Sequence, residues 1–331
     1  MTKTIVCCSE AADGDWKWIA PEVDEADFHF VSCAPRNSLE RHPLFNIARF
    51  RGSFEAVRLS KRIGADLLVA HGPTLTAWCA LFGRWLTMRA KVTSFAFNFS
   101  VTPNRLKTWV FSRALRTVDR FFVFSNVERQ LYARLFSLPE QKFEFIHWGV
   151  HPSAPNTTPS GSGDYVCAIG GNARDYFTLI EAARLLPDIP FMLVVRPENV
   201  RGIKLPSNVA VQINIPYSVC MGILYQSRFM VLPLINAEIP CGHVTIVAAM
   251  HLGKAMVVTS SSGVADYVTD NENAITVPPN DVNAMASAIR RLWQDRELCL
   301  HLGNEGKMRA TKLYNESSVV DHFRNYLRSL A

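Results

Sequence analysis

The sequence lacks any uninterrupted apolar segment of the length that a membrane-spanning helix needs. The best candidate, residues 64–83, is interrupted by Asp66, His71 and Pro73. The first residues also lack the basic start, apolar core and small-residue cleavage site of a signal peptide. We therefore expect a cytoplasmic protein without a transmembrane helix.

Cysteine pairs are absent too. The eight cysteines form no CxxC motif, and Cys7 and Cys8 are adjacent, so we expect reduced thiols and neither a disulfide framework nor a zinc site. The nine histidines show no metal-ligand spacing, so no metal is expected. The composition, 48% hydrophobic and 19% charged, is that of a globular protein and excludes disordered, collagen-like and coiled-coil chains.

The excess positive charge is confined to one segment. Residues 36–134 hold 17 basic and 5 acidic side chains, a net charge of +12, whereas residues 1–35 carry −5. Such a segment favours an anionic partner. Between residues 78 and 120, aromatic side chains alternate with the basic ones, a pattern typical of a helix at an anionic membrane surface and equally of an amphipathic helix with one face in the core. No nucleic-acid-binding motif is present, so nucleic acid is not an expected partner.

The chain is long enough for two domains. Residues 152–164, rich in Pro, Ser, Gly and Thr, read as a linker between an N-terminal domain, 1–151, and a C-terminal domain, 165–331, whose last helix is expected to pack back on the first domain.

Short β-rich runs alternate with helical patterns in both halves, which predicts an α/β fold. The expected strands are 4–8, 28–32, 67–70, 92–97, 121–124 and 143–146, then 165–169, 191–195, 209–214, 229–232, 255–259 and 274–277. The expected helices are 54–63, 74–88, 105–115 and 127–136, then 176–186, 218–226, 243–251, 282–295, 297–314 and 317–330. This alternation indicates two doubly wound parallel-sheet domains facing a cleft, with ligands beyond the carboxyl ends of the strands.

Two loops that follow strands have the residue types of an anion site. The first contains Gly170 and Gly171, whose backbone can approach a ligand closely, followed by Arg174 and a helix start. Glycine pairs also end strands for steric reasons. The second loop runs to another helix start at Gly242, and its residue Glu238 could bind sugar hydroxyls or simply be solvated.

These pieces together resemble family 4 glycosyltransferases of the GT-B fold. The resemblance is carried by "AIGGNARDYFTLIEAARLL", by "FIHWGVHPS", and by the ordered pieces "VLPL", "CG", "AAM", "GKAMVVTSSSGVADYV" and "NAITVPPND". It covers about residues 143–325 well, and the N-terminal half loosely.

The resemblance implies a retaining, metal-independent transferase. Such an enzyme moves a hexosyl group from a nucleoside-diphosphate sugar, with UDP or GDP as the expected nucleotide, to a glycan or lipid-phosphate acceptor in polysaccharide or glycolipid assembly. It needs no cofactor, and peripheral contact with the inner face of the cytoplasmic membrane accords with the basic segment.

The resemblance also assigns residues. The catalytic assignments are His71, which contacts the sugar or the acceptor, Glu238, which positions the donor sugar, and Arg174, which stabilises the leaving diphosphate. Donor binding is assigned to Gly170, Gly171, Asn172, Arg196, Gly242, His243 and Thr245 around the diphosphate, and to Ile215, Pro216 and Tyr217 against the base. Arg196 could instead form a surface ion pair with Glu198, and His71 could cap a turn.

The sequence departs from the family pattern in two places. The second carboxylate of the family's acidic pair, which usually contacts the ribose, falls on Ala248, and residues 12–16 replace the usual glycine-rich loop of the first domain. Three alternatives therefore stay open. One is a non-catalytic sugar- or nucleotide-binding protein of the same fold, which Ala248 favours, and another is a sugar-nucleotide epimerase. The third is a soluble transferase that acts on a small acceptor, for which the basic segment is incidental.

Overall fold

The structure is a computed structural model that describes residues 2–11, 16–37, 39–40, 47–99, 103–149, 163–235 and 240–330. The chain forms two compact units. The N-terminal unit comprises Met1–Ile146 together with Val319–Ala331, and the C-terminal unit comprises His147–Ser318. Most of the predicted linker lies outside the described residues.

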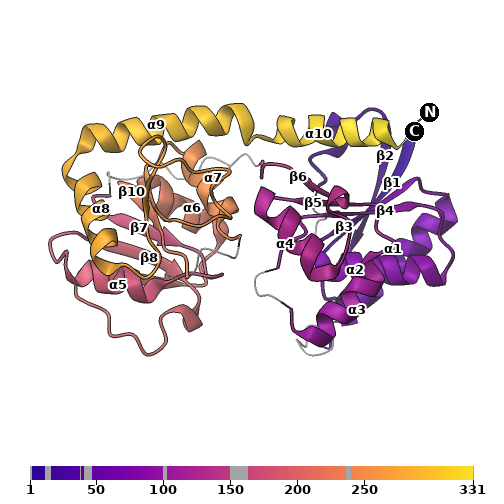
Figure 1. The fold of residues 1–331 in the computed structure, drawn as a ribbon, viewed down its shortest axis with the longest axis horizontal. Helices are drawn as coiled ribbons and strands as arrows, with labels where there is room; N and C mark the ends of the chain where they lie inside the picture. Colours follow the sequence, from indigo (N-terminus) through magenta and orange to yellow (C-terminus); the bar gives the residue numbers. More distant parts are fainter. Residues whose placement is uncertain are drawn as a thin grey trace. The chain divides into compact units, whose positions relative to one another are not determined.

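The N-terminal unit is built on a parallel sheet with the order β2-β1-β3-β4-β5-β6 (Figure 1). Its strands are β1 (Lys3–Ser9), β2 (Ala26–Ser32), β3 (Leu67–His71), β4 (Lys91–Phe95), β5 (Arg120–Val123) and β6 (Phe143–Phe145). Its helices are α1 (Ile47–Ile63), α2 (Pro73–Trp85), α3 (Arg105–Leu115), α4 (Asn126–Phe136) and, from the end of the chain, α10 (Glu316–Ser329).

Helices cover both faces of this sheet. Helices α1 to α4 supply the core on one face, where Val6 and Leu68 are fully buried. On the other face α10 packs against β4 and β5, with the hydroxyl of Tyr326 2.5 Å from Oγ1 of Thr93 and its ring 5.2 Å from the ring of Phe122. The last helix therefore belongs structurally to the first unit.

The C-terminal unit has a second parallel sheet with the order β12-β11-β10-β7-β8-β9. Its strands are β7 (Val166–Ile169), β8 (Phe191–Val195), β9 (Val209–Ile213), β10 (Phe229–Leu232), β11 (Met256–Thr259) and β12 (Ile275–Val277). Its helices are α5 (Tyr176–Arg184), α6 (Tyr217–Gln226), α7 (His243–His251), α8 (Val282–Gln294) and α9 (Arg296–Leu313).

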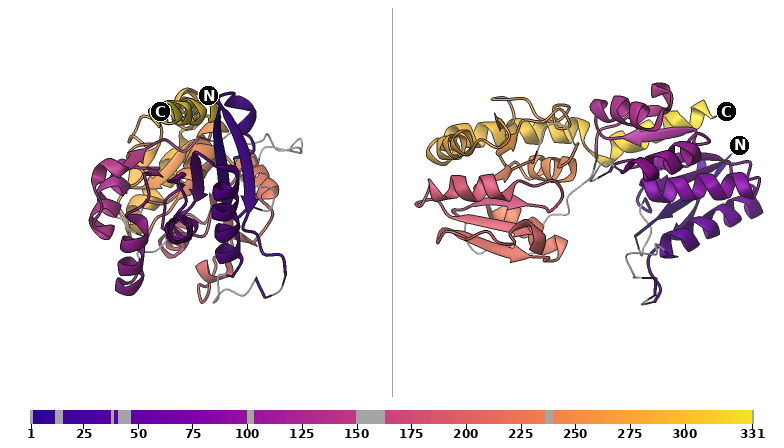
Figure 2. Two further views of the ribbon diagram at one scale, coloured as in Figure 1. Left: turned by 90° about the vertical axis from the view of Figure 1, so that its right-hand side faces the viewer. Right: turned by 60° about the horizontal axis from the view of Figure 1, so that its bottom comes forward.

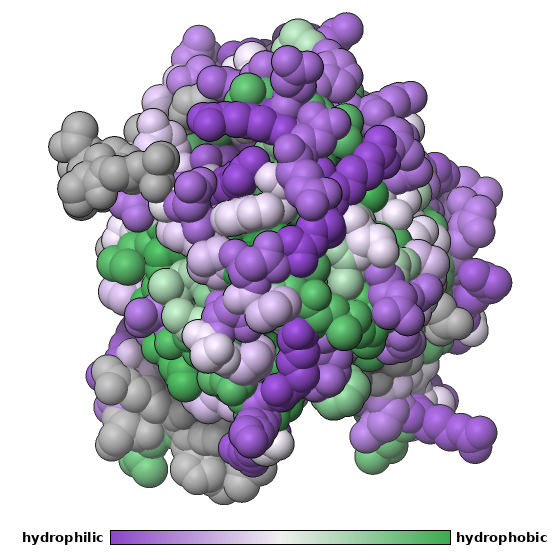
Figure 3. All heavy atoms as spheres, turned by 90° about the vertical axis from the view of Figure 1, so that its left-hand side faces the viewer, coloured by the Kyte–Doolittle hydropathy of each residue, from purple (hydrophilic) through white to green (hydrophobic). Residues whose placement is uncertain are grey.

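Successive residues of β7 point into different cores. Val166 and Ala168 pack with α5 and α8, whereas Cys167 and Ile169 pack with α6 and α7. A strand buried on both faces must be apolar throughout, which explains its continuous hydrophobic run. Figure 2 shows the helices lying on both sides of the sheet, and Figure 3 shows hydrophilic side chains interspersed with hydrophobic ones on the face that it draws.

The predicted α/β fold class, with two parallel sheets flanked by helices, is confirmed. The largest difference in an element is at α1, which begins at Ile47 instead of residue 54. Its first turns expose Ile47 and Phe50, so the apolar residues there do not form the single buried stripe by which a helix is predicted from sequence. Across the described ranges, no helix is long and apolar enough to cross a bilayer, and all eight cysteines are free thiols.

Candidate functional site

The sheet of the C-terminal unit reverses its strand order between β7 and β10. The chain proceeds from β7 through β8 to β9 at one edge, and then returns to β10 on the other side of β7. Parallel sheets bind ligands at the carboxyl ends of their strands at such a reversal. The loops after β7 and β10 are joined there. The amide of Asp175 donates to the carbonyl of Pro233 at 3.0 Å, and the backbones of Arg174 and Leu234 form an antiparallel β-bridge.

Arg174 lies at this junction and is only 7% exposed. Its guanidinium donates to the Asn172 carbonyl at 2.8 Å and to Oγ1 of Thr245, at the start of α7, at 3.3 Å. Within the described residues, which exclude 236–239, no carboxylate forms an ion pair with it. Burial lowers the pKa of the guanidinium, but an arginine stays protonated. A buried cation with no acidic partner among the described residues favours an anionic ligand.

Two glycines make room for arginine side chains over the backbone. Gly170 has φ of +110°, and a Cβ there would lie 2.8 Å from Nη2 of Arg174. A Cβ on Gly171 would lie 2.6 Å from Cδ of Arg196. Any larger side chain would therefore displace one of the two cations.

Arg196 follows β8, the strand next to β7. Its Nη1 donates to Oδ1 of Asn172 at 2.8 Å. No ion pair links it to Glu198 in the part of the chain described. The structure therefore places a second, exposed cation beside the loop that holds Arg174.

The start of α7 offers backbone amides more than side chains. Gly242 is the N-terminal capping residue, with φ of +100°. The imidazole of His243 is 5% exposed, its Nε2 lies 2.7 Å from the Gly263 carbonyl, and burial lowers its pKa to about 4. His243 is therefore neutral at pH 7, and its ring is engaged by the protein, which leaves its amide at the helix start for an anion.

The predicted base-binding residues lie farther along the sheet edge. Ile215, Pro216 and Tyr217 follow β9, two strands from β7, and Tyr217 is 56% exposed. The structure thus brings Gly170, Gly171, Asn172, Arg174, Arg196 and Thr245 together, and sets residues 215–217 at the end of the edge strand.

The structure describes only one of the two positions that correspond to the family's acidic pair. Glu238 lies outside the described residues. Ala248 is 1% exposed within the core of α7, so its position faces the protein interior. A side chain at this position contacts the core, and Ala248 offers no polar group to a ligand.

His71 belongs to the other unit, at the end of β3. Its ring centroid lies 5.1 Å from that of Trp16 and 5.4 Å from that of Phe95. Burial lowers its pKa to about 3, so the imidazole is neutral at pH 7. It can accept or donate a hydrogen bond there, but it cannot supply a positive charge.

Sequence reasoning missed two residues that shape the loop after β7. The hydroxyl of Tyr176 donates to the Gly170 carbonyl at 2.7 Å, and Nδ2 of Asn199 donates to the Gly171 carbonyl at 3.0 Å. Tyr176 reads as an ordinary core residue of a helix. The Pro197-Glu198-Asn199 turn after a strand is a polar signal that could have indicated Asn199.

Both halves of the chain match family models. The model Glycosyltransferase Family 4 matches residues 6–154, and the model Glycosyl transferases group 1 matches residues 178–295. No curated protein sequence matches the chain.

Solved structures share the fold at low identity. Sucrose-phosphate synthase from Thermosynechococcus elongatus is 17% identical with a TM-score of 0.76, and the alignment covers 99% of each chain. HepE from Anabaena, in complex with UDP and glucose, is 14% identical with a TM-score of 0.77, covering 99% of this chain and 100% of that one. A glycosyltransferase from Rickettsia africae is 14% identical with a TM-score of 0.73, covering 99% and 98%.

The two family models cover most of the chain in order, one on each unit, and the solved relatives align over nearly its whole length. The protein therefore belongs to the family 4 glycosyltransferases and has the GT-B fold.

Proposed function

We propose that this glycosyltransferase uses a nucleoside-diphosphate sugar as donor and binds its diphosphate at the junction of the loops after β7 and β10. The observation that carries the proposal is Arg174, a buried cation 3.3 Å from Thr245 without a described acidic partner. Gly171 and the start of α7 add backbone amides, whereas the Gly170 amide donates to the Val194 carbonyl at 3.0 Å. Such preorganised donors stabilise the charge that develops on a departing diphosphate.

The donor nucleotide proposed is UDP, with GDP second. HepE, which shares the fold, was solved with UDP and with UDP-glucose. Transfer of a hexosyl group with retention, without a metal or cofactor, to a glycan or lipid-phosphate acceptor is the further part of the proposal. Glu238 and His71 are the proposed contacts of the donor sugar and the acceptor.

A thermal-shift panel of UDP, GDP, ADP, TDP and CDP, each with and without EDTA, tests the donor site. A ligand at about 100 times its Kd adds roughly 2.7 kcal/mol to the free energy of unfolding, which raises Tm by degrees. We expect one nucleotide to stand out and EDTA to leave its shift unchanged. No shift with any of them would contradict the proposal.

A non-catalytic binding protein is the second candidate, because Ala248 supplies no carboxylate for a ribose. Product formation separates the two. The protein is incubated with the sugar nucleotide of the identified base, with and without glycan or lipid-phosphate acceptors, and the released nucleoside diphosphate is measured. A transferase releases the nucleoside diphosphate over repeated turnovers. Binding without turnover under every acceptor condition would favour the second candidate.

We also propose peripheral contact with an anionic membrane through α3. Leu106, Trp109 and Val110 on this helix are 72%, 53% and 43% exposed, although the spacing of Leu106 and Val110 with Ala114 is that of one core-facing stripe. The Arg113 guanidinium lies 3.9 Å from the centroid of the Trp109 ring. Exposed apolar side chains among cations are typical of a helix that lies in a headgroup layer.

Sedimentation with phosphatidylglycerol vesicles tests this contact. The double variant L106Q/W109Q should lose most of the binding, and Leu300→Gln, which changes a 60% exposed leucine on α9, should keep it. Because the attraction is partly electrostatic, added salt should also reduce binding. Binding that ignores both the double variant and salt would rule out α3 as the contact.

A further inference from the structure

A pocket outside the candidate site opens at the edge of the C-terminal sheet where the strands begin. It has a volume of about 570 Å³, within the range of small-molecule sites. Its lining includes Asp164 before β7, Tyr225 in α6, Arg228 before β10, Lys254 before β11, and Arg296 and Cys299 in α9. The candidate site is formed by loops that follow β7 and β10. Because these strands are parallel, the pocket lies at the opposite edge of the sheet.

Lys254 is a partly buried cation on the pocket wall. Its Nζ donates to the Ser227 carbonyl at 2.6 Å and lies 5.7 Å from the centroid of the Tyr225 ring. Burial lowers the pKa of its amine, because the ammonium group has lost part of its hydration. An ammonium group has three donors, so Lys254 can donate to this carbonyl and to a ligand at the same time.

Two arginines add their charges from other segments. Cζ of Arg228 lies 4.5 Å from the centroid of the Trp293 ring, and this stacking limits where the guanidinium points. Arg296 is the first residue of α9 and is exposed. A guanidinium offers paired N–H groups that match the oxygens of a carboxylate or a phosphate. Three segments that are distant in sequence thus bring three cations to one pocket.

The acidic groups around the pocket do not neutralise these cations. One carboxylate, that of Asp164, is in the lining, which leaves a net charge of +2. Within the described ranges, none of the three cations forms an ion pair. The carboxylate of Asp295, next to Arg296, accepts from the Leu298 amide at 2.8 Å and caps α9. Residues 150–162, which precede the lining and lie outside the described ranges, contain no Asp or Glu.

We propose that this pocket binds a compact, water-soluble dianion. A ligand with two negative charges matches the net charge of the lining and removes the repulsion among three like charges. The ring of Tyr225 is 42% exposed and offers apolar surface to the carbon atoms of the ligand. Dicarboxylates and phosphate groups share this chemistry. The pocket contains none of the donor-site residues, so the inference goes beyond the proposed function.

Calorimetric titration at pH 8 with malonate and with inorganic phosphate tests the proposal, with acetate as the monoanion for comparison. We expect at least one dianion to bind at least tenfold more tightly than acetate. Tighter binding of malonate would identify a dicarboxylate as the ligand, and tighter binding of phosphate would identify a phosphate group.

Variants locate the binding. K254Q/R296Q should weaken binding of the tighter dianion at least tenfold. Arg296→Gln alone should weaken it at least threefold, and it should retain the Tm of the unaltered protein because the residue is exposed. K307Q/K312Q, which removes two exposed lysines of α9, should change the affinity less than twofold.

A second readout is local to the pocket. Acetylation by acetic anhydride, followed by peptide mass spectrometry, measures the reaction rate of each lysine. The bound dianion should slow the acetylation of Lys254 at least fivefold and leave Lys307 and Lys312 within twofold. Because this readout does not involve the donor loops, failure of the proposed donor site leaves it intact.

Three results would overturn the inference. The first is an affinity for both dianions no higher than for acetate. The second is unchanged dianion affinity in Arg296→Gln and in K254Q/R296Q, which would show that these cations do not form the site. The third is equal acetylation of Lys254 with and without the dianion, which would place the bound anion elsewhere on the protein.

Discussion

Arg174 joins two loops through its hydrogen bonds and retains a full charge with little exposed surface. Within the described residues it has no acidic partner. Burying such a cation is costly in the absence of a ligand, and a bound diphosphate would offset that cost. Charge-assisted hydrogen bonds contribute about 1.5–3 kcal/mol each.

We therefore expect Arg174→Gln to raise the Kd for the nucleotide by roughly 10- to 150-fold. Arg201→Gln, an exposed change in the same unit, should leave Kd within twofold. Titration calorimetry with the nucleotide identified in the panel measures both. Wild-type affinity in Arg174→Gln would remove this arginine from the site.

Glu128 is a buried acid that the sequence analysis did not single out. Its carboxylate accepts from the amide of Phe124 at 2.9 Å and from Nδ2 of Asn98 at 2.6 Å, at the start of α4. Burial nevertheless raises its pKa from 4.5 to about 7. Ser125 and Glu128 are three residues apart, as in a helix capping box, and this spacing is the sequence signal that could have indicated Glu128.

The raised pKa of Glu128 makes stability depend on pH. Between pH 4.5 and 7 the folded state holds the proton and the unfolded state does not, so the free energy of unfolding falls as pH rises through this window. The loss is on the order of 2–3 kcal/mol. Urea unfolding at pH 5 and pH 7.5 should show a smaller decrease for Glu128→Gln than for wild type. Equal decreases would show that Glu128 titrates normally.

At the residue level, the clustering of Gly170, Gly171 and Arg174 after β7 could be predicted because all three belong to one loop. The roles of Tyr176 and Asn199 could not, because each acts on a carbonyl that only the folded loop brings near it. The burial of the His243 ring was likewise invisible, since its partner, Gly263, is distant in sequence.

Among the elements, α9 and α7 pack closely enough to require a glycine. A Cβ on Gly303 in α9 would lie 2.3 Å from the Gly253 carbonyl oxygen after α7. Gly222 in α6 has open space around its Cβ position. The two glycines have the same cost in helix propensity but opposite surroundings.

We expect Gly303→Ala to lower the free energy of unfolding by about 1–3 kcal/mol through overpacking. Gly222→Ala should instead raise it by about 0.5–1 kcal/mol, because alanine is the better helix former. Urea unfolding of both variants checks the pair. A stabilising Gly303→Ala would mean that the two helices are not in contact there.

Element positions were largely predictable, because apolar runs and periodic patterns are local properties. Strands 191–195 and 229–232 agree with β8 and β10 to the residue. The helix at 105–115 agrees with α3 in its bounds, yet its apolar stripe is exposed at Leu106 and Val110. Periodicity indicates which residues share a helix face, but only tertiary packing decides how much of that face is covered.

At the scale of the whole molecule, the end of the chain returns to the first unit. Tyr326 on α10 contacts Thr93 and Phe122 of the N-terminal sheet, whereas Tyr314, at the end of α9, packs 5.0 Å from Tyr267 in the C-terminal unit. Two tyrosines twelve residues apart thus stabilise different units.

Calorimetric unfolding with and without UDP should separate these contributions. Tyr326→Ala should lower the transition of the N-terminal unit, with a loss of about 3–5 kcal/mol for a buried aromatic, and leave the UDP-responsive transition in place. Tyr314→Ala should lower the UDP-responsive transition instead. If Tyr326→Ala lowered that transition equally, the two units would unfold as one.

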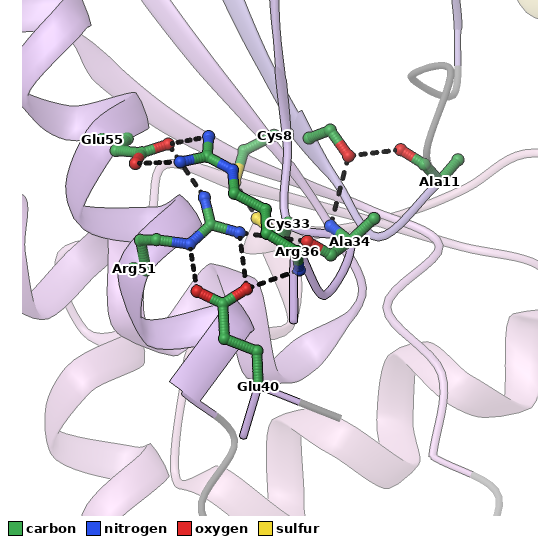
Figure 4. A network of polar contacts seen from close by, with 9 residues as sticks. Cys8, Ala11, Cys33, Ala34, Arg36, Glu40, Arg51 and Glu55 are labelled. Carbon is green, nitrogen blue, oxygen red and sulfur yellow. Dashed lines mark hydrogen bonds and ion pairs between the residues drawn. The ribbon is translucent and has the colours of Figure 1, made fainter. Parts of the chain in front are cut away.

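The sequence by itself determined the strand–helix alternation, the concentration of positive charge in residues 36–134 and the loops that carry Arg174 and Gly242, because each is a local or compositional property. The tertiary structure decided which cations lack partners. Arg36 and Arg51 pair with Glu40 and Glu55 (Figure 4), whereas Arg58 and Arg62 have no ion pair among the described residues, and this difference depends on how β2 and α1 are set side by side. Charge can be counted along a chain, but its neutralisation depends on distances that only the fold sets.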